Sequence, residues 1–370
     1  MSSMLPAPPK SFGMLGDVLI SALGSVTGES NPLNLAKKRS VCVILVDGLG
    51  SHNLKESGAH ASYLNSRASL SASCYFPATT ATSIVSFATG KPPWETNFIG
   101  YQIYERNSEI KRNLLTGWES QEVAKEYQSL QTVSESTIKR DIEFHTVAPS
   151  AYKDSGFTAA TMRKSAFHGT KSLAERFEIA KTLLADSKPK LVYLYVPELD
   201  QLAHAKGWQS QDWLSKLENL DAEISYLAKD LTKNAAIVVT ADHGVIDVRH
   251  SNHVYIDAFI EKDALLNVGG DTRALYLYLR DVSTRDSYLA ILQKELGGSC
   301  HVVTPEDLIE SGYWTSEINR DLVPDMLILA KKEVALYHRD FAKKKSLEMI
   351  GHHGSITAQE MSIPLIPIGY

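Results

Sequence analysis

The sequence predicts an α/β fold with a mainly parallel central sheet and helices on both of its faces. Three apolar runs, at 41–46, 191–196 and 235–240, each lead into a polar turn that contains an aspartate. Continuous apolar runs of this length, rich in β-branched residues, are typical of strands that are buried on both faces. Amphipathic patterns at 173–184 and 214–227 predict helices between these strands, and this alternation favours a parallel sheet.

The composition is that of an ordinary globular protein and argues against several other classes. The chain has 370 residues, of which 44% are hydrophobic and 22% are charged, so it can bury a substantial core. Its formal net charge of -5 gives no overall positive field that would hold a nucleic-acid backbone. We therefore expect no nucleic acid as a structural partner.

Cysteine content and hydropathy predict a cytoplasmic protein without a membrane span. The 3 cysteines show no CxxC spacing, which argues against a disulfide framework and against a thiolate zinc cluster. No apolar stretch reaches the roughly 18 residues that cross a bilayer. The short apolar run at 18–24 has only Lys10 before it as a positive charge, so we do not expect a signal peptide. The oligomeric state stays open.

The chain divides into a short N-terminal arm and one large domain. Several prolines surround a single possible amphipathic helix within residues 1–36, which we interpret as the arm, and we expect residues 37–370 to form the domain. The segment at about 95–150 is rich in charged residues and weakly periodic, so we interpret it as a lid-like insertion. We expect a second polar excursion at 245–270, then a strand at 274–279 and a helix at 287–296.

Acidic residues follow the three predicted strands, and two of the strands are also followed by a histidine. These residues are Asp47, Asp200, His204, Asp242 and His243. Ligands of parallel sheets bind outside the carboxyl ends of the strands, so the fold itself brings these side chains together. Asp200 and His204 are four residues apart and would point to one centre from a helical turn.

This set of side chains predicts two divalent metal ions. A further imidazole pair, His352 and His353, lies near the C-terminus. Oxygen and nitrogen donors of this mix suit Zn²⁺ or Mn²⁺, and they are more numerous than one tetrahedral ion would bind. Taken singly, each element has a simpler explanation as a helix cap, a turn or a solvated pair. Their shared position after apolar strands favours a common site.

Hydroxyl side chains cluster between Phe76 and Gly90, at the expected start of a helix. Simple helix capping would explain such a cluster. Alternatively, one hydroxyl faces the metals, which would lower its pKa enough for it to act as a nucleophile. A helix N-terminus at this point would also favour a phosphate anion.

Five segments of the chain resemble, in order, the type I phosphodiesterase and nucleotide pyrophosphatase family of the alkaline phosphatase superfamily. They are VILVDGLG at 43–50, FPATTATSIVSFATG at 76–90, ELDQLAH at 198–204, TADHG at 240–244 and HHGSITAQEM at 352–361. The resemblance implies an alkaline phosphatase-like fold with polar insertions, and a metal-dependent hydrolase that acts on small-molecule phosphate esters.

The same resemblance implies a role for individual residues. Alignment of Pro77 and Thr89-Gly90 with the family pattern selects Thr80, rather than Thr79 or Thr82, as the nucleophile. One metal ion would be bound by Asp47, Thr80, Asp242 and His243, and the other by Asp200, His204 and His353. Zn²⁺ is the expected ion, with Mn²⁺ as the second choice. Family members usually have Phe-Pro-Asn after the nucleophile, and in the corresponding Ala81-Thr82-Ser83 only Ser83 is expected to bind substrate.

The resemblance leaves several reactions open. The leading hypothesis is hydrolysis of a phosphodiester or pyrophosphate through a covalent phosphoryl-threonine. A phosphomonoesterase, a phosphonate hydrolase, a phosphomutase and an inactive metal or phosphate sensor are the alternatives. His250 and His253 are expected not to bind the metals, because the family pattern leaves no place for them. Trp118 is expected either to stack on substrate or to pack in the core.

Overall fold

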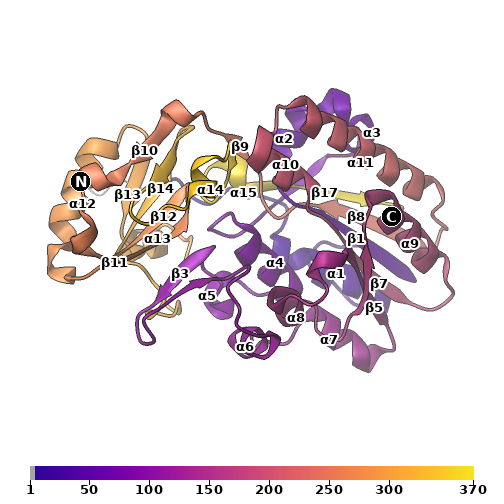
Figure 1. The fold of residues 1–370 in the computed structure, drawn as a ribbon. Helices are drawn as coiled ribbons and strands as arrows, with labels where there is room; N and C mark the ends of the chain where they lie inside the picture. Colours follow the sequence, from indigo (N-terminus) through magenta and orange to yellow (C-terminus); the bar gives the residue numbers. More distant parts are fainter. Residues whose placement is uncertain (1–4) are drawn as a thin grey trace.

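The computed structural model describes residues 5–370, and its centre is a sheet of seven strands in the order β2-β17-β8-β1-β7-β5-β6 (Figure 1). The strands are β1 (Ser40–Val46), β2 (Leu70–Ser73), β5 (Glu143–Pro149), β6 (Ala166–Thr170), β7 (Lys190–Val196), β8 (Ala235–Thr240) and β17 (Ser362–Ile368). β1 pairs in parallel with both β7 and β8, whereas β17 runs antiparallel to its neighbours β2 and β8. The expected mainly parallel α/β sheet is confirmed.

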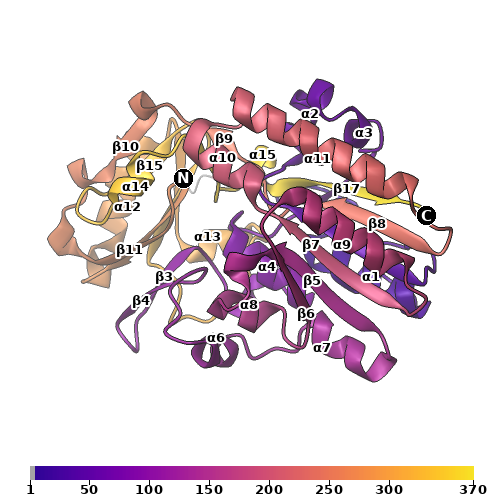
Figure 2. The same ribbon diagram turned by 45° about the vertical axis from the view of Figure 1, so that its right-hand side comes forward.

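Helices cover both faces of this sheet, as the sequence predicts (Figures 1 and 2). One face carries α9 (Leu173–Ala185) and α11 (Gln211–Lys229), which correspond to the two amphipathic patterns. The other carries α1 (Leu15–Thr27) and α4 (Thr80–Thr89), which contact each other. Because α1 buries Leu15, Val18 and Leu19 completely, it belongs to the main hydrophobic core. The division of the chain into arm and domain stays a prediction.

A second, smaller sheet is antiparallel and has its own apolar core. It contains β11 (Leu265–Asp271), β12 (Ala274–Leu279), β14 (Met326–Ala330) and β13 (Cys300–Val303), in that order. Together with α12 (Arg285–Leu296), it buries a separate hydrophobic cluster that includes Leu277, Leu292 and Ile328. The expected strand at 274–279 and the helix near 287–296 are confirmed.

The expected bound of the polar excursion at 245–270 is wrong, because β11 begins at Leu265 within it. Only some positions of this strand are buried, and its second half contains Gly269 and Gly270. Its residues therefore lack the continuous apolar pattern that marked the strands of the central sheet. Pairing with β12, rather than local composition, makes this segment a strand.

The segment between α4 and β5 forms a wall beside the second sheet. It contains a hairpin of β3 (Gln102–Glu105) and β4 (Ile110–Asn113), followed by α6 (Gln121–Tyr127) and α7 (Val133–Thr137). The hairpin strand β3 contacts β11. Residues 143–149 of the expected insertion form β5 of the central sheet. A lid function for the remainder stays a prediction.

No helix among the described residues 5–370 is both long enough and apolar enough to cross a membrane.

A buried ion pair joins the second sheet to the C-terminal segment. Arg273, between β11 and β12, donates from Nε to Glu360 Oε1 over 2.8 Å and from Nη2 to Glu360 Oε2 over 2.9 Å. Both side chains are fully buried. Glu360 Oε1 also accepts a hydrogen bond from the backbone N–H of Ser355, so the pair holds the loop that follows His353.

We expect Arg273→Ala to lower the free energy of unfolding by about 3–5 kcal/mol, because Glu360 would remain as a buried, uncompensated charge. Urea denaturation followed by circular dichroism measures this loss. Arg320 is a matched control, because its ion pair with Glu306 lies at the surface. Arg320→Ala should cost no more than about 1 kcal/mol. Equal losses in the two variants would contradict the structural role of the buried pair.

Candidate active site

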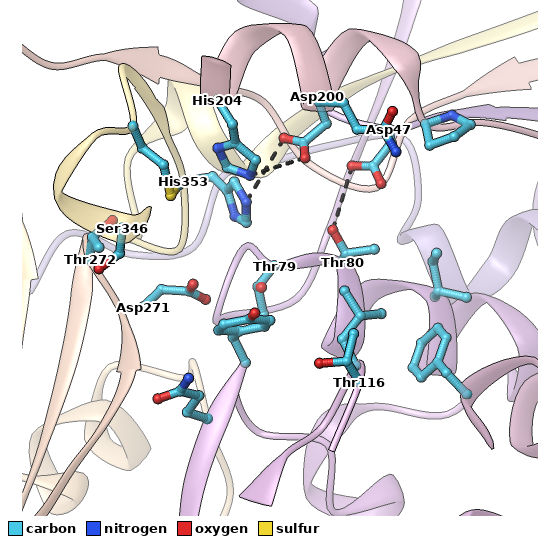
Figure 3. Close-up of a pocket in the computed structure, with 18 of the residues that line it drawn as sticks. Asp47, Thr79, Thr80, Thr116, Asp200, His204, Asp271, Thr272, Ser346 and His353 are labelled. Carbon is cyan, nitrogen blue, oxygen red and sulfur yellow. Dashed lines mark hydrogen bonds and ion pairs between the residues drawn. The ribbon is translucent and has the colours of Figure 1, made fainter. Parts of the chain in front are cut away.

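The parallel strands β1, β7 and β8 end at one edge of the central sheet and bring three aspartates together. Val46 of β1 is paired with Val196 of β7, and Leu45 with Thr240 of β8. Asp47 and Asp242 come just after β1 and β8, and Asp200 lies in the first turn of α10 (Glu198–Lys206), which follows β7. The convergence that the sequence predicts therefore follows from the strand register (Figure 3).

Thr80 begins α4 beside these carboxylates. Its Oγ1 lies 3.1 Å from His243 Nε2 and 3.5 Å from Asp47 Oδ1. Thr79 is the N-cap residue in extended conformation, and Gly90 ends the helix with φ +70°, a left-handed conformation that glycine adopts without steric cost. The hydroxyl at 80 thus lies at the helix N-terminus, where the free N–H groups favour an anion.

The other hydroxyl residues of α4 are placed differently. Thr82 and Ser83 are fully buried, and neither lines the cavity at the site. Ser83 interacts with the thiol of Cys74. The structure thus shows no contact between Ser83 and the cavity, and substrate binding by Ser83 stays a prediction.

Carboxylate and imidazole atoms form two overlapping groups in which all ligand atoms lie within 4.8 Å of one another. The first consists of Asp47, Asp242 and His243, and the second of Asp200, His243 and His353. His204 lies beside the second group, with Nε2 3.1 Å from Asp200 Oδ2. All the aspartates and histidines that the sequence analysis selected are therefore together, with the His243 and His353 rings stacked 3.8 Å apart.

Backbone carbonyls orient the three histidines of the site. The Nδ1 atoms lie within hydrogen-bond distance of carbonyl oxygens: 2.8 Å from Gly351 for His204, 3.2 Å from Gly244 for His243 and 2.9 Å from Ala78 for His353. If Nδ1 carries the proton and donates it to the carbonyl, the Nε2 lone pair points into the site. This is the usual arrangement of histidines that bind metals.

The two adjacent histidines near the C-terminus are clearly distinguished. His352 has Nδ1 2.8 Å from Thr272 Oγ1 and Nε2 3.2 Å from the Met349 carbonyl, so its ring faces away from the aspartates. His353 faces Asp200, with Nε2 3.9 Å from Oδ1. His250 and His253 pack against each other with ring centroids 5.1 Å apart, and neither belongs to the two groups of potential ligands.

Burial and mutual repulsion disfavour the charged forms of the carboxylates. Burial, followed by the charges of Asp242 and Asp200, raises the pKa of Asp47 well above its usual value. Burial also raises the pKa of Asp242, although His243 partly opposes this. At Asp200, nearby His204 outweighs burial and lowers the pKa.

These carboxylates fit a site for divalent cations. Asp200 Oδ1 and Asp242 Oδ2 are buried and have no hydrogen-bond partner among the described residues. Buried carboxylate oxygens normally have a partner or coordinate a metal. Positive charge between the two groups would supply the missing partners and offset the repulsion among the aspartates.

Two residues that sequence reasoning missed also line the site. Tyr195 donates a hydrogen bond from its hydroxyl to Asp47 Oδ2. Asp271, at the end of β11, lines the same cavity, and burial raises the pKa of its carboxyl to about 7. Alternation along β7 would have placed Tyr195 on one face of the sheet, but no local pattern marks Asp271.

The site opens into a cavity of about 1200 Å³. Most of the potential metal ligands line it, namely Asp47, Thr80, Asp200, His204 and His353. Aromatic residues from several elements also line it, including Tyr101, Trp118, Tyr152 and Phe157. Trp118 also packs with its ring centroid 5.2 Å from that of Tyr127, and its Nε1 donates to the Leu114 carbonyl. Trp118 therefore packs against Tyr127 and also lines the cavity, and its stacking on a substrate stays a prediction.

The family model described as type I phosphodiesterase / nucleotide pyrophosphatase matches residues 41–356. This range contains all the potential metal ligands described above. A comparison with curated protein sequences gave no match.

Solved structures with the same fold include the following proteins. Murine ectonucleotide pyrophosphatase / phosphodiesterase 5 is 16% identical, with a TM-score of 0.68, over 89% of this chain and 87% of that chain. An inactive form of the murine protein, in complex with AMP, is 15% identical, with a TM-score of 0.66, over 88% of this chain and 87% of that chain. Phosphonoacetate hydrolase from Sinorhizobium meliloti 1021, in complex with phosphonoformate, is 18% identical, with a TM-score of 0.68, over 89% of this chain and 90% of that chain.

The metal-free protein should lose stability as the pH rises from about 7 to about 9. The pKa of His204 is raised from 6.5 to about 9, because Asp200 and the Gly351 carbonyl outweigh burial. This histidine binds a proton more tightly in the folded chain, so its contribution to stability is fully present below pH 6.5 and is lost as the pH rises to about 9. The pKa of Asp271 is raised from 3.8 only to about 7, so its contribution is lost below this window. Buried His353, whose pKa is lowered, is neutral throughout this window.

Melting temperatures of chelator-treated protein at these two pH values measure the effect. A His204→Ala variant should show a smaller decrease, because one of the titrating groups is removed. A melting temperature that rises with pH in the metal-free protein would contradict the expected sign.

Proposed function

The chain belongs to the type I phosphodiesterase / nucleotide pyrophosphatase family, and we propose that it hydrolyses small-molecule phosphate esters with Thr80 as its nucleophile. The observation that carries this proposal is the position of the Thr80 hydroxyl. It lies at the start of α4, 3.1 Å from His243 Nε2 and beside both groups of potential metal ligands. Family membership supports a phosphoester hydrolase, and this geometry supports the nucleophile.

We propose two divalent cations, Zn²⁺ or alternatively Mn²⁺. Asp47, Thr80, Asp242 and His243 would hold one, and Asp200, His204 and His353 the other. When bound, the ions would lower the pKa of the attacking hydroxyl and stabilise negative charge on the attacking and leaving oxygens. The buried oxygens of Asp200 and Asp242 that lack partners support this assignment.

The residues of the chain would position the reaction. Thr80 Oγ1 attacks phosphorus in line, so that its bond to phosphorus forms as the bond to the ester oxygen breaks. The proton that the hydroxyl loses would reach the departing oxygen through solvent, and the leaving group would depart as an alcohol. Tyr195 fixes Asp47 through its hydrogen bond, and the first N–H groups of α4 face the phosphoryl oxygens. Water then hydrolyses the phosphothreonine, which releases the phosphate product and restores the hydroxyl.

A phosphodiester or pyrophosphate is the substrate class that we favour. The cavity of about 1200 Å³ is large enough for an organic group of nucleotide size, and aromatic side chains line it. A similar site would also serve a phosphomonoesterase, a phosphonate hydrolase or a phosphomutase. An inactive sensor would need the site only to bind metal or phosphate. Assays of zinc- and manganese-loaded protein against a diester, a monoester and a phosphonate would separate these alternatives. Cytoplasmic localisation stays a prediction.

Thr80→Ala should reduce the hydrolysis rate by several orders of magnitude, because the nucleophile and one metal ligand are lost together. The variant should still fold. Thr82→Ala is the matched control, since Thr82 is buried in the same helix and does not line the cavity. Mass spectrometry of acid-quenched turnover should locate the phosphoryl adduct on Thr80, and an adduct on Thr79 or Thr82 would show that the assigned nucleophile is wrong.

His353→Ala should bind fewer metal ions than the wild type, which should bind about two per chain after reconstitution and gel filtration. His352→Ala is the control, because that adjacent ring faces Thr272 and Met349 instead of the aspartates. Elemental analysis of the three proteins measures the difference. Retention of all metal by His353→Ala would remove this histidine from the ligand set.

A further inference from the structure

Asp271 enters the candidate site from the second sheet rather than from the central one. It ends β11 and lines the same cavity as Thr80, Asp200 and His353. Figure 3 shows its carboxylate directed toward Thr79 and below His353. The sheet that carries the potential metal ligands thus meets a separate structural element at this acidic side chain.

The backbone around Asp271 holds it close to the loop that carries His353. A Cβ atom on Gly354 would lie 2.8 Å from Asp271 Cβ, and one on Gly270 would lie 2.0 Å from the Ala274 carbonyl oxygen. Both glycines have positive φ angles, +124° and +75°. Only glycine permits this close approach of the two segments, so the position of Asp271 relative to His353 is fixed.

One oxygen of this carboxylate lacks a partner among the described residues. The Oδ2 atom is buried and has no hydrogen-bond partner there. The Thr79 side chain makes a hydrogen bond with the carboxyl, and Tyr101 is a further polar neighbour. A buried carboxylate oxygen without a partner is costly, and its position in a substrate cavity indicates that the partner belongs to the substrate.

Asp271 is also separate from the metal ligands. Neither of the two groups of ligand atoms that lie within 4.8 Å of one another includes it. Its titratable neighbours are His243 of the first proposed ligand set and His204 and Asp200 of the second. Because the attacking Thr80 belongs to the first set, the leaving oxygen would lie near the second, and Asp271 would lie on the side of the leaving group.

We propose that Asp271 determines specificity by accepting a hydrogen bond from a hydroxyl or ammonium group of the leaving alcohol, a few bonds from the ester oxygen. This inference deepens the proposed function and rests on it. A site built to bind such a donor rejects an analogue without one, because the buried acceptor is then left unpaired. The substrate class is therefore a phosphate ester whose leaving alcohol carries a second polar donor.

Three chromogenic substrates test this proposal. They are methyl phosphodiesters of 4-nitrophenol with an ethyl, a hydroxymethyl or an aminomethyl group at the 2-position. These groups are similar in size, and two of them place a donor next to the ester oxygen. For each zinc-reconstituted protein, kcat/KM of a donor substrate is divided by kcat/KM of the ethyl reference. Comparison of this ratio between variants cancels the intrinsic reactivity of each leaving group.

Asp271→Ala should lower this ratio at least about tenfold relative to the wild type for one or both donor substrates. Asp271→Asn keeps an acceptor but removes the charge, so it should lose a preference of the wild type for the aminomethyl substrate and retain one for the hydroxymethyl substrate. The donor substrate whose ratio falls in Asp271→Ala identifies the group that Asp271 accepts from. Asp154→Ala is the matched control, because Asp154 is an exposed acid of the same cavity, and it should leave both ratios unchanged.

The outcomes separate this proposal from the proposed function. If the wild type hydrolyses the ethyl reference but Asp271→Ala leaves both ratios unchanged, the specificity role is overturned and the hydrolase stands. If Asp271→Ala and Asp271→Asn bind fewer metal ions by elemental analysis, Asp271 is a ligand and the specificity role is again overturned. If the wild type hydrolyses none of the three substrates, the proposed function fails and this inference fails with it.

Discussion

Repulsion among buried aspartates at one edge of the parallel sheet is the constraint on which the site depends. The register of β1, β7 and β8 places Asp47, Asp200 and Asp242 together without regard to their charges. In a medium of low dielectric constant, such carboxylates must be protonated, paired or bound to cations. Histidines relieve only part of the repulsion, since His204 lowers the pKa of Asp200 while that of Asp47 stays raised. The sheet therefore creates an electrostatic requirement that bound cations would satisfy.

The orientation of the histidines depends on backbone carbonyls from distant segments of the chain. The carbonyls that orient His353 and His204 belong to Ala78 and Gly351, which lie in the loop before α4 and near the C-terminus. The buried pair of Arg273 and Glu360 connects this C-terminal segment to the second sheet. A buried ion pair is weak evidence for stability as such, but this one fixes two loops that both reach the cavity.

Sequence patterns predict the parts of the site that follow buried strands, and not the parts that depend on tertiary contacts. The aspartates at 47, 200 and 242 could be found because apolar runs precede them. The choice of Thr80 among three threonines, and of His353 over His352, needed the family resemblance, since composition alone does not distinguish these neighbours. Asp271 could not be found, because β11 contains glycines and half-exposed positions and becomes a strand through pairing with β12. Its approach to Gly354 joins segments with no local relation in the sequence.

The two sheets contribute different groups to the proposed active site. The central sheet and α4 hold the groups that would perform the chemistry, and their geometry is fixed by parallel pairing. The second sheet contributes Asp271 and, through contact with β3, supports the wall that includes Tyr101 and Gln102. One face of the second sheet has its own hydrophobic cluster, whereas Ala274 and Tyr276 on the other face belong to the main core. Asp271 and Thr272 at the β11–β12 turn belong to neither cluster, so they can differ without repacking the core beneath the metal ligands. Preference for the leaving group can therefore change while the position of the nucleophile is preserved.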